Sequence, residues 1–205
     1  MNRSSPLRVL ALALACFTGC GTPLSFSGAS VPTPHTFNLT ADDLAEAEDE
    51  SCAQTWFTGD AEADIERVDE ILTMEGLKIV HWNPTGSAGT SGRQSIYVDK
   101  SYKDKSAADQ ALLMSHELVH ACDRKRLGDA TFEQRYFHSA GRWVFEVRAY
   151  AQTVRSLVAQ GASAKRVAAY IDDRIVSLRQ GYWLHDIDPS QYEQETRRLL
   201  ELAAK

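Results

Sequence analysis

The sequence predicts an α+β fold that is mostly helical, with a small β-sheet before a central helix. Only two short segments, Lys78–Trp82 and Ser95–Val98, have β-rich composition, and Pro and Gly occur repeatedly in the loop between them. Apolar residues recur at helical spacing over several longer stretches, which are 60–74, 107–127, 131–160, 163–180 and 189–204.

The ends of the central helix are marked by residue type. Ser106 is a common N-cap residue, Ala107–Leu127 contains neither Pro nor Gly, and Gly128 follows as a stop signal. Gly76 ends the helix before the strands in the same way. We expect Thr131–Gln160 to form a second long helix directly after the central one.

The central helix carries a His-Glu-x-x-His motif formed by His116, Glu117 and His120. Positions i and i+4 share one face of a helix, so both imidazoles can bind one Zn²⁺ ion. Glu117 is then placed beside the open position of the metal, where a base is needed that is not itself a ligand. Two ordinary histidines on an amphipathic helix are the alternative, but the apolar flanks would make them costly to bury without a metal.

A catalytic zinc site needs a third protein ligand, and Glu146 in the next helix is the candidate. Ala149, one turn later, is small enough to let the two helices approach closely. A solvated or salt-bridged carboxylate is the alternative role for Glu146. The other nearby donors are Asp123, Asp129, Glu133 and His138.

A helix with this motif, followed by a helix that supplies a glutamate, resembles the gluzincin clan of zinc metallopeptidases. The stretches His116–Asp123 (HELVHACD) and Glu146–Ala149 (EVRA) resemble the HELIHAYD and SEIRA stretches of the mitochondrial inner-membrane processing peptidases that mature an ATP synthase subunit. The resemblance covers only the middle of the chain. It implies a zincin-like fold, the three zinc ligands, and Glu117 as general base.

The same resemblance implies that Asp123 orients a ligating imidazole from outside the ligand set. Cys122, however, stands where the family has Tyr, and the cysteine-rich surroundings of the family are missing. These departures leave the substrate open. Ser95–Val98 lies where the clan has an edge strand that pairs with extended substrate, so its edge is the candidate peptide-docking site, with a covered hairpin as the alternative.

The N-terminus has the pattern of a secretion signal over residues 1–19. Arg3 and Arg8 lie near an apolar run, Val9–Phe17, that is too short to span a bilayer. The sequence Phe-Thr-Gly-Cys ending at Cys20 resembles a bacterial lipobox, which implies acylation of Cys20. Cys16 is the competing position, and secretion without a lipid is a further alternative.

If Cys20 is acylated, the protein is attached to a membrane of the bacterial cell envelope through its lipid anchor. By resemblance to lipoprotein sorting in Gram-negative bacteria, the absence of Asp after Cys20 favours the outer membrane. Residues 20–40 are rich in Ser, Thr, Pro and Gly and are expected to form a flexible tether, followed by a single domain over 41–205.

The composition limits the partners and the cysteine chemistry. The net charge of the whole chain is −6, and no basic cluster is present, which argues against nucleic acid as a partner. The acidic residues 42–50 lack the spacing of a calcium loop and are expected to form a solvated helix or turn. Cys52 and Cys122 remain after the signal, and an oxidising envelope favours a disulfide between them.

These observations predict a zinc-dependent metallopeptidase that hydrolyses peptide bonds of envelope proteins or peptides. The main alternative is a non-catalytic zinc-containing lipoprotein that acts as an assembly factor or binding module. A hydrolase of peptidoglycan peptides is a third, weaker possibility. His138, Tyr150 and His185 stay outside the predicted site, because no spacing argument connects them to the metal.

Overall fold

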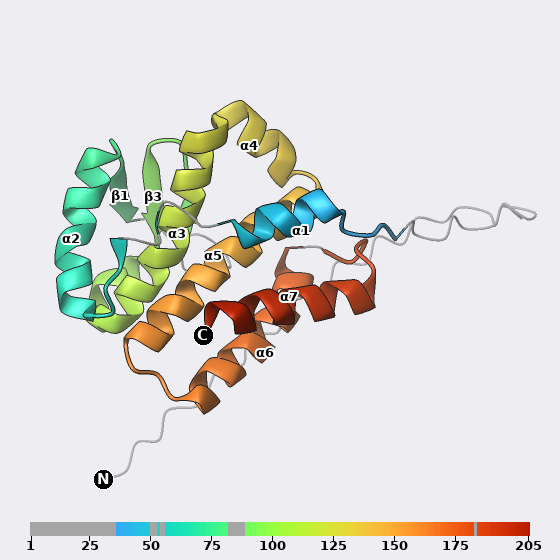
Figure 1. The fold of residues 1–205 in the computed structure, drawn as a ribbon. Coiled ribbons are helices and arrows are strands. Elements are labelled where there is room, and N and C mark those ends of the chain that lie inside the picture. The colour runs from blue at the N-terminus through green and yellow to red at the C-terminus, as the bar shows by residue number, and fades with distance from the viewer. Residues whose placement is uncertain (1–35, 50–52, 54–55, 82–88, 183) are drawn as a thin grey trace, which may run out of the picture. The chain divides into compact units, whose positions relative to one another are not determined.

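The structure is a computed structural model that describes residues 36–49, 53, 56–81, 89–182 and 184–205. These residues are mostly helical and include one small sheet, as predicted (Figure 1). In chain order the elements are α1 (Ala41–Glu48), α2 (Ala61–Met74), β1 (Lys78–His81), β2 (Gly89–Ser91), β3 (Ser95–Val98), η2 (Lys100–Asp104), α3 (Ala107–Leu127), α4 (Asp129–Tyr136), α5 (Ser139–Ala159), α6 (Ala164–Gly181) and α7 (Pro189–Ala203).

Capping residues set the predicted boundaries of α2 and α3. The side chains of Asp60 and Ser106 each accept a hydrogen bond from a backbone N–H in the first turn of their helix. Gly76 and Gly128 follow these helices with φ of 67° and 78°, a conformation that favours glycine. Both boundaries are confirmed.

The prediction of one helix over Thr131–Gln160 is wrong, because the chain turns between α4 and α5. Gly141 lies against the end of α4, where a Cβ atom would come within 2.4 Å of the Arg135 carbonyl oxygen. Arg142 donates from Nε to the carbonyl oxygen of Tyr136 at 2.9 Å, which satisfies the end of α4. Phe132 and Phe145 are buried on either side of the break, so apolar spacing alone could not reveal it.

The sheet has the order β1-β3-β2, with β1 parallel and β2 antiparallel to β3. The predicted open edge at Ser95–Val98 is therefore wrong, because strands pair with β3 on both sides. The alternative of a covered hairpin is confirmed for β2 and β3, which are neighbours in the sequence and antiparallel, whereas β1 pairs with β3 in parallel. Gly89–Ser91, in the segment expected to be a loop, forms the strand that covers β3, while Trp82 lies outside the described residues.

Two hydrophobic clusters lie on the two sides of the packed pair α3 and α5. One joins α1, α5, α6 and α7 and includes Trp143 and Leu200. The other joins α2, the sheet and α3 and includes Ile71, Ile96 and Leu118. Figure 1 shows α5 running through the middle of this arrangement. The pair α3 and α5 is thus packed on both sides, so the side chains at the contact between these two helices are held in fixed positions.

The packed domain begins before the predicted boundary at residue 41. Phe37 forms a parallel bridge with Ile187, and Leu39 is buried and exchanges two hydrogen bonds with the Gln191 side chain. The last residues of the predicted tether therefore pack on the domain. The acidic segment that follows forms α1, as expected.

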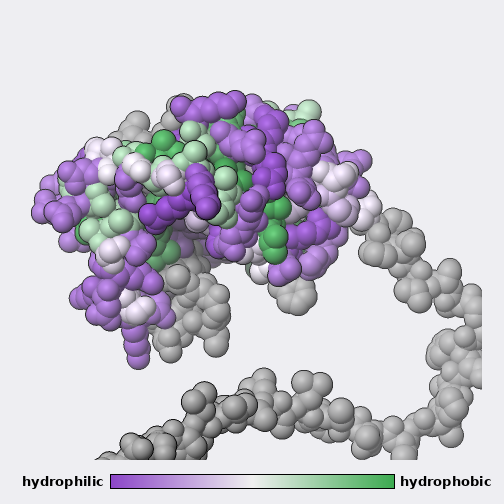
Figure 2. All heavy atoms as spheres, turned by 90° about the horizontal axis from the view of Figure 1, so that it is seen from below, coloured by the Kyte–Doolittle hydropathy of each residue, from purple (hydrophilic) through white to green (hydrophobic). Residues whose placement is uncertain are grey.

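Hydrophilic side chains cover most of the face shown in Figure 2. None of the helices in the described part of the chain combines the length and the apolar character needed to cross a membrane. The predicted signal peptide and both candidate lipidation sites, Cys16 and Cys20, lie outside the described residues.

Candidate metal centre

The packing of α3 against α5 brings His116, His120 and Glu146 together in the interior. The Nε2 atoms of the two histidines are 3.2 Å apart. Each Nε2 lies 3.5 Å from an oxygen of the Glu146 carboxylate. All three side chains are buried, and this group can hold a metal ion.

The spacing of the two imidazole nitrogens suits tetrahedral zinc. Bonds of about 2.0–2.1 Å to nitrogen and oxygen place neighbouring ligands of a tetrahedron about 3.3–3.4 Å apart. The 3.2 Å between the two Nε2 atoms lies close to this value, while the two 3.5 Å separations run to different carboxylate oxygens, from His116 to Oε2 and from His120 to Oε1 of Glu146. Two imidazoles and one carboxylate are also a ligand set found in catalytic zinc sites, which keep their fourth position open.

The other ligand candidates lie elsewhere. Asp129 and Glu133 form ion pairs with Arg93 and Arg124, and His138 is exposed beside the break before α5. Ala149, on α5, is fully buried and packs in the hydrophobic cluster that contains α3. This agrees with its predicted role as a small residue at the contact between the two helices.

The protonation states of two members favour metal binding. Burial lowers the pKa of His120 to about 4, so this imidazole is neutral at pH 7. Burial alone would raise the pKa of Glu146, but His120 and the hydrogen bond from His116 outweigh it and lower this pKa. Burial likewise lowers the pKa of His116, but its hydrogen bond to Glu146 and the nearby carboxylates raise it overall. A cation that binds here must therefore compete with a proton on His116.

Glu117 stands outside the ligand group, as the motif predicts. Its side chain is buried, and burial raises its pKa to about 7. The Oε2 atom of Glu117 has no hydrogen-bond partner among the described residues. A carboxylate with a pKa near neutrality can both accept and return a proton.

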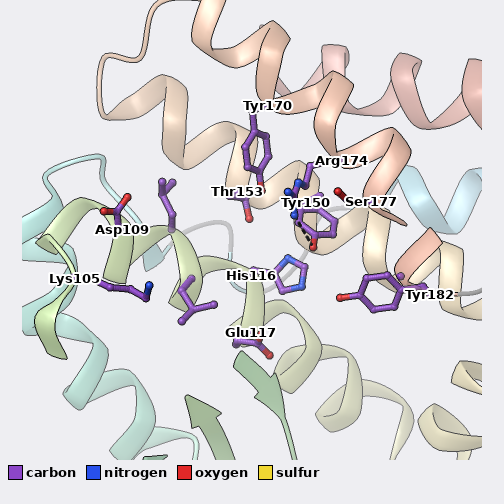
Figure 3. A pocket seen from close by; sticks show the side chains of 13 residues that line it. Lys105, Asp109, His116, Glu117, Tyr150, Thr153, Tyr170, Arg174, Ser177 and Tyr182 are labelled. Atoms are coloured by element: carbon purple, nitrogen blue, oxygen red, sulfur yellow. Dashed lines mark hydrogen bonds between the residues drawn. The ribbon is translucent and has the colours of Figure 1, made fainter. Parts of the chain in front are cut away.

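His116 and Glu117 both face a cleft of about 500 Å³. Its walls come from the first half of α3, from α5 and from α6, and they include Tyr150, Arg174 and Tyr182 (Figure 3). The metal group therefore has one side that is accessible from solvent, next to the free carboxylate.

Tyr136 is a site residue that the sequence analysis missed. Its hydroxyl donates a hydrogen bond of 2.6 Å to Oε1 of Glu146. The residue ends α4 and reaches the site only because the chain turns before α5. Its spacing from Glu146 carries no signal within a single helix, so no local sequence pattern indicates this contact.

Asp123 does not orient an imidazole, which corrects the role implied by the family resemblance. It is 1% exposed and accepts a 2.7 Å hydrogen bond from Nη1 of Arg148, with Arg126 at 3.5 Å. The Nδ1 atoms of His116 and His120 have no partner among the described groups. Asp123 thus connects α3 to α5 through a buried ion pair.

Cys122 is disulfide-bonded in the structure. Its predicted partner, Cys52, lies outside the described residues, so that pairing stays a prediction. Tyr150, which is not among the predicted site residues, has its ring centroid 4.4 Å from that of His116. His185 is exposed and is not a member of the group formed by His116, His120 and Glu146.

Comparison of the chain with protein-family models, with curated proteins and with solved structures finds no match. The assignment of a function therefore depends on the residues and geometry of the site.

Proposed function

We propose that the protein is a zinc-dependent metallopeptidase with a zincin-like arrangement of its central helices. One observation carries the proposal: the ligand atoms of the buried group His116, His120 and Glu146 lie within 4.8 Å of one another, beside a cleft that His116 lines together with Glu117, a carboxylate outside the ligand set. The substrate would be a protein or peptide of the bacterial envelope.

The chain's own residues supply the remaining parts of the hydrolysis. His116, His120 and Glu146 would hold Zn²⁺, which lowers the pKa of a bound water and polarises a carbonyl group. Glu117 accepts a proton from the attacking water at its carboxylate and returns it to the leaving amine. Tyr136 holds the Glu146 carboxylate through its hydroxyl.

The alternative is a non-catalytic lipoprotein in which zinc only joins α3 to α5. Structural zinc sites usually close their fourth position with another Cys or His. The cleft on the open side of this group, and the free Oε2 of Glu117 beside it, favour catalysis over that role.

Metal content tests the proposal directly. The purified protein should bind one equivalent of zinc, and His116→Ala, His120→Ala and Glu146→Ala should each lose stoichiometric binding, because a three-ligand site depends on every ligand. His138→Ala is the matched control and should keep its zinc. Elemental analysis after dialysis measures the result, and full zinc retention in Glu146→Ala would overturn the ligand assignment.

The envelope location is part of the same proposal and has its own test. Cys20→Ser should block acylation and move the protein from the membrane fraction to the soluble fraction, because the anchor would be lost. Cys16→Ser is the control and should stay membrane-bound. Fatty-acid labelling that persists in Cys20→Ser and disappears in Cys16→Ser would assign the lipid to Cys16.

A further inference from the structure

One wall of the cleft carries an arginine whose guanidinium lies against two neighbouring aromatic rings. The Cζ atom of Arg174, in α6, lies 5.3 Å from the ring centroid of Tyr150 and 5.3 Å from that of Tyr170. Figure 3 shows Arg174 and both tyrosines on the side of the cleft above His116. Contacts with two aromatic rings limit the rotamers that the arginine side chain can adopt.

The hydrogen-bonding capacity of Arg174 is only partly used. Nη1 lies 3.4 Å from the Tyr150 hydroxyl, and Nε is buried without a hydrogen-bond partner. Nη2 contacts the carboxylate of Asp173, the preceding residue, whose side chain is 59% exposed. An exposed ion pair of this kind contributes little to stability, so a ligand can replace it.

Arg174 is also close to the metal group. Tyr150 lies between the two, with its ring 4.4 Å from the His116 ring and its hydroxyl next to Arg174. An extended peptide advances about 3.3–3.6 Å per residue. A substrate group bound by Arg174 would thus lie on one of the two residues joined by the cleaved bond, or on a residue very close to that bond.

We propose that Arg174 is a specificity residue that binds a carboxylate of the substrate. This inference rests on the proposed peptidase function and names its substrate class: peptides with a C-terminal carboxylate, or an Asp or Glu side chain, next to the cleaved bond. The planar guanidinium matches a carboxylate through two parallel N–H···O bonds. Tyr150 and Tyr170 hold it in advance, which reduces the entropy lost on binding.

Peptide hydroxamates that bind zinc test this without requiring cleavage. Three probes share one short apolar backbone: the first ends in a free carboxylate, the second carries a Glu side chain and ends in an amide, and the third is neutral with a terminal amide. Dissociation constants are measured on the zinc-loaded full chain in detergent. We expect at least one carboxylate probe to bind about 10-fold to 100-fold more tightly than the neutral probe, as for a charge-assisted hydrogen bond. Which of the two does so identifies the source of the carboxylate.

Variants of α6 assign the effect to Arg174. Arg174→Gln should bind all three probes with the affinity of the neutral one, while Arg174→Lys should keep part of the preference because it keeps the charge but not the planar geometry. Arg166→Gln, at an exposed position of the same helix, is the control and should bind like the parent. If Arg174→Gln does not fold, the Arg174→Lys variant and the parent preference still decide the question.

The outcomes separate this inference from the function on which it rests. Equal affinity for the three probes in the parent would overturn the carboxylate assignment and leave the zinc peptidase intact. A preference that persists in Arg174→Gln, or one that is undiminished in Arg174→Lys, would also overturn it. If the zinc-loaded parent binds none of the hydroxamates, the proposed peptidase function fails, and the inference fails with it.

Discussion

Glu117→Gln should abolish peptide hydrolysis while leaving the zinc site filled. The substitution preserves the size of the side chain and changes none of the three proposed ligands, but an amide cannot accept a proton from the attacking water. A positioned general base contributes about 10²–10⁴-fold, so we expect a loss of at least about 100-fold in kcat/KM. Mass spectrometry of a peptide mixture incubated with parent and variant measures it.

The controls separate loss of the base from loss of the fold. Glu70→Gln makes the same substitution at an exposed position of α2 and should keep both zinc and activity. Zinc content and thermal unfolding of Glu117→Gln should match those of the parent. If the parent cleaves no envelope protein and Glu117→Gln fully rescues a deletion strain, zinc is a structural ligand and the enzyme proposal fails.

The sequence predicts those members of the metal site that lie close together along one helix. His116, Glu117 and His120 share a single helix, so the helical period alone places the two imidazoles together. Glu146 required the further expectation that the next long helix packs against the first one. That expectation holds in the structure even though the predicted helix is divided into α4 and α5, because Glu146 lies on the α5 side of the break.

The residues that were missed or misplaced depend on contacts that no local pattern encodes. Tyr136 reaches Glu146 only after the turn near Gly141, and Asp123 meets Arg148 across the interface between α3 and α5. The position of β3 in the sheet was mispredicted for the same reason. The strand that covers β3, Gly89–Ser91, is short and follows a segment rich in Gly and Pro. It is a strand because it pairs with β3, and its composition alone does not indicate one.

The second large effect that we expect is a loss of stability when the ion pair between Asp123 and Arg148 is broken. Their side chains are 1% and 3% exposed, and the oxygen–nitrogen distance is 2.7 Å. Breaking a buried ion pair typically costs about 3–5 kcal/mol. Arg126, 45% exposed and 3.5 Å away, would compensate the remaining Asp123 charge only in part. Arg148→Met removes the cation and retains most of the side-chain volume. We therefore expect a loss of this size in the free energy of unfolding.

Replacing both partners, with Asp123→Leu and Arg148→Met in one chain, should recover most of the stability, because no buried charge is then left alone. Arg126→Gln is the control for the outer partner of Asp123. The Arg126 side chain is 45% exposed and lies 3.5 Å from the carboxylate, so its removal should cost less than about 1 kcal/mol. Unfolding of the four proteins, at one fixed zinc concentration, gives the comparison.

The pH dependence of the Arg148→Met variant identifies the cause of its instability. Burial raises the pKa of Asp123 above its ordinary value, and the Arg148 charge partly opposes this shift. Without Arg148 the folded-state pKa should rise further, so the variant loses stability as the pH increases through that value, while protonated Asp123 tolerates burial at lower pH. The deficit relative to the parent should thus be larger at pH 8 than at pH 5, and at pH 8 should lower Tm by about 10 °C. A deficit under about 1 kcal/mol, equal at both pH values, would show that the pair does not hold α3 against α5.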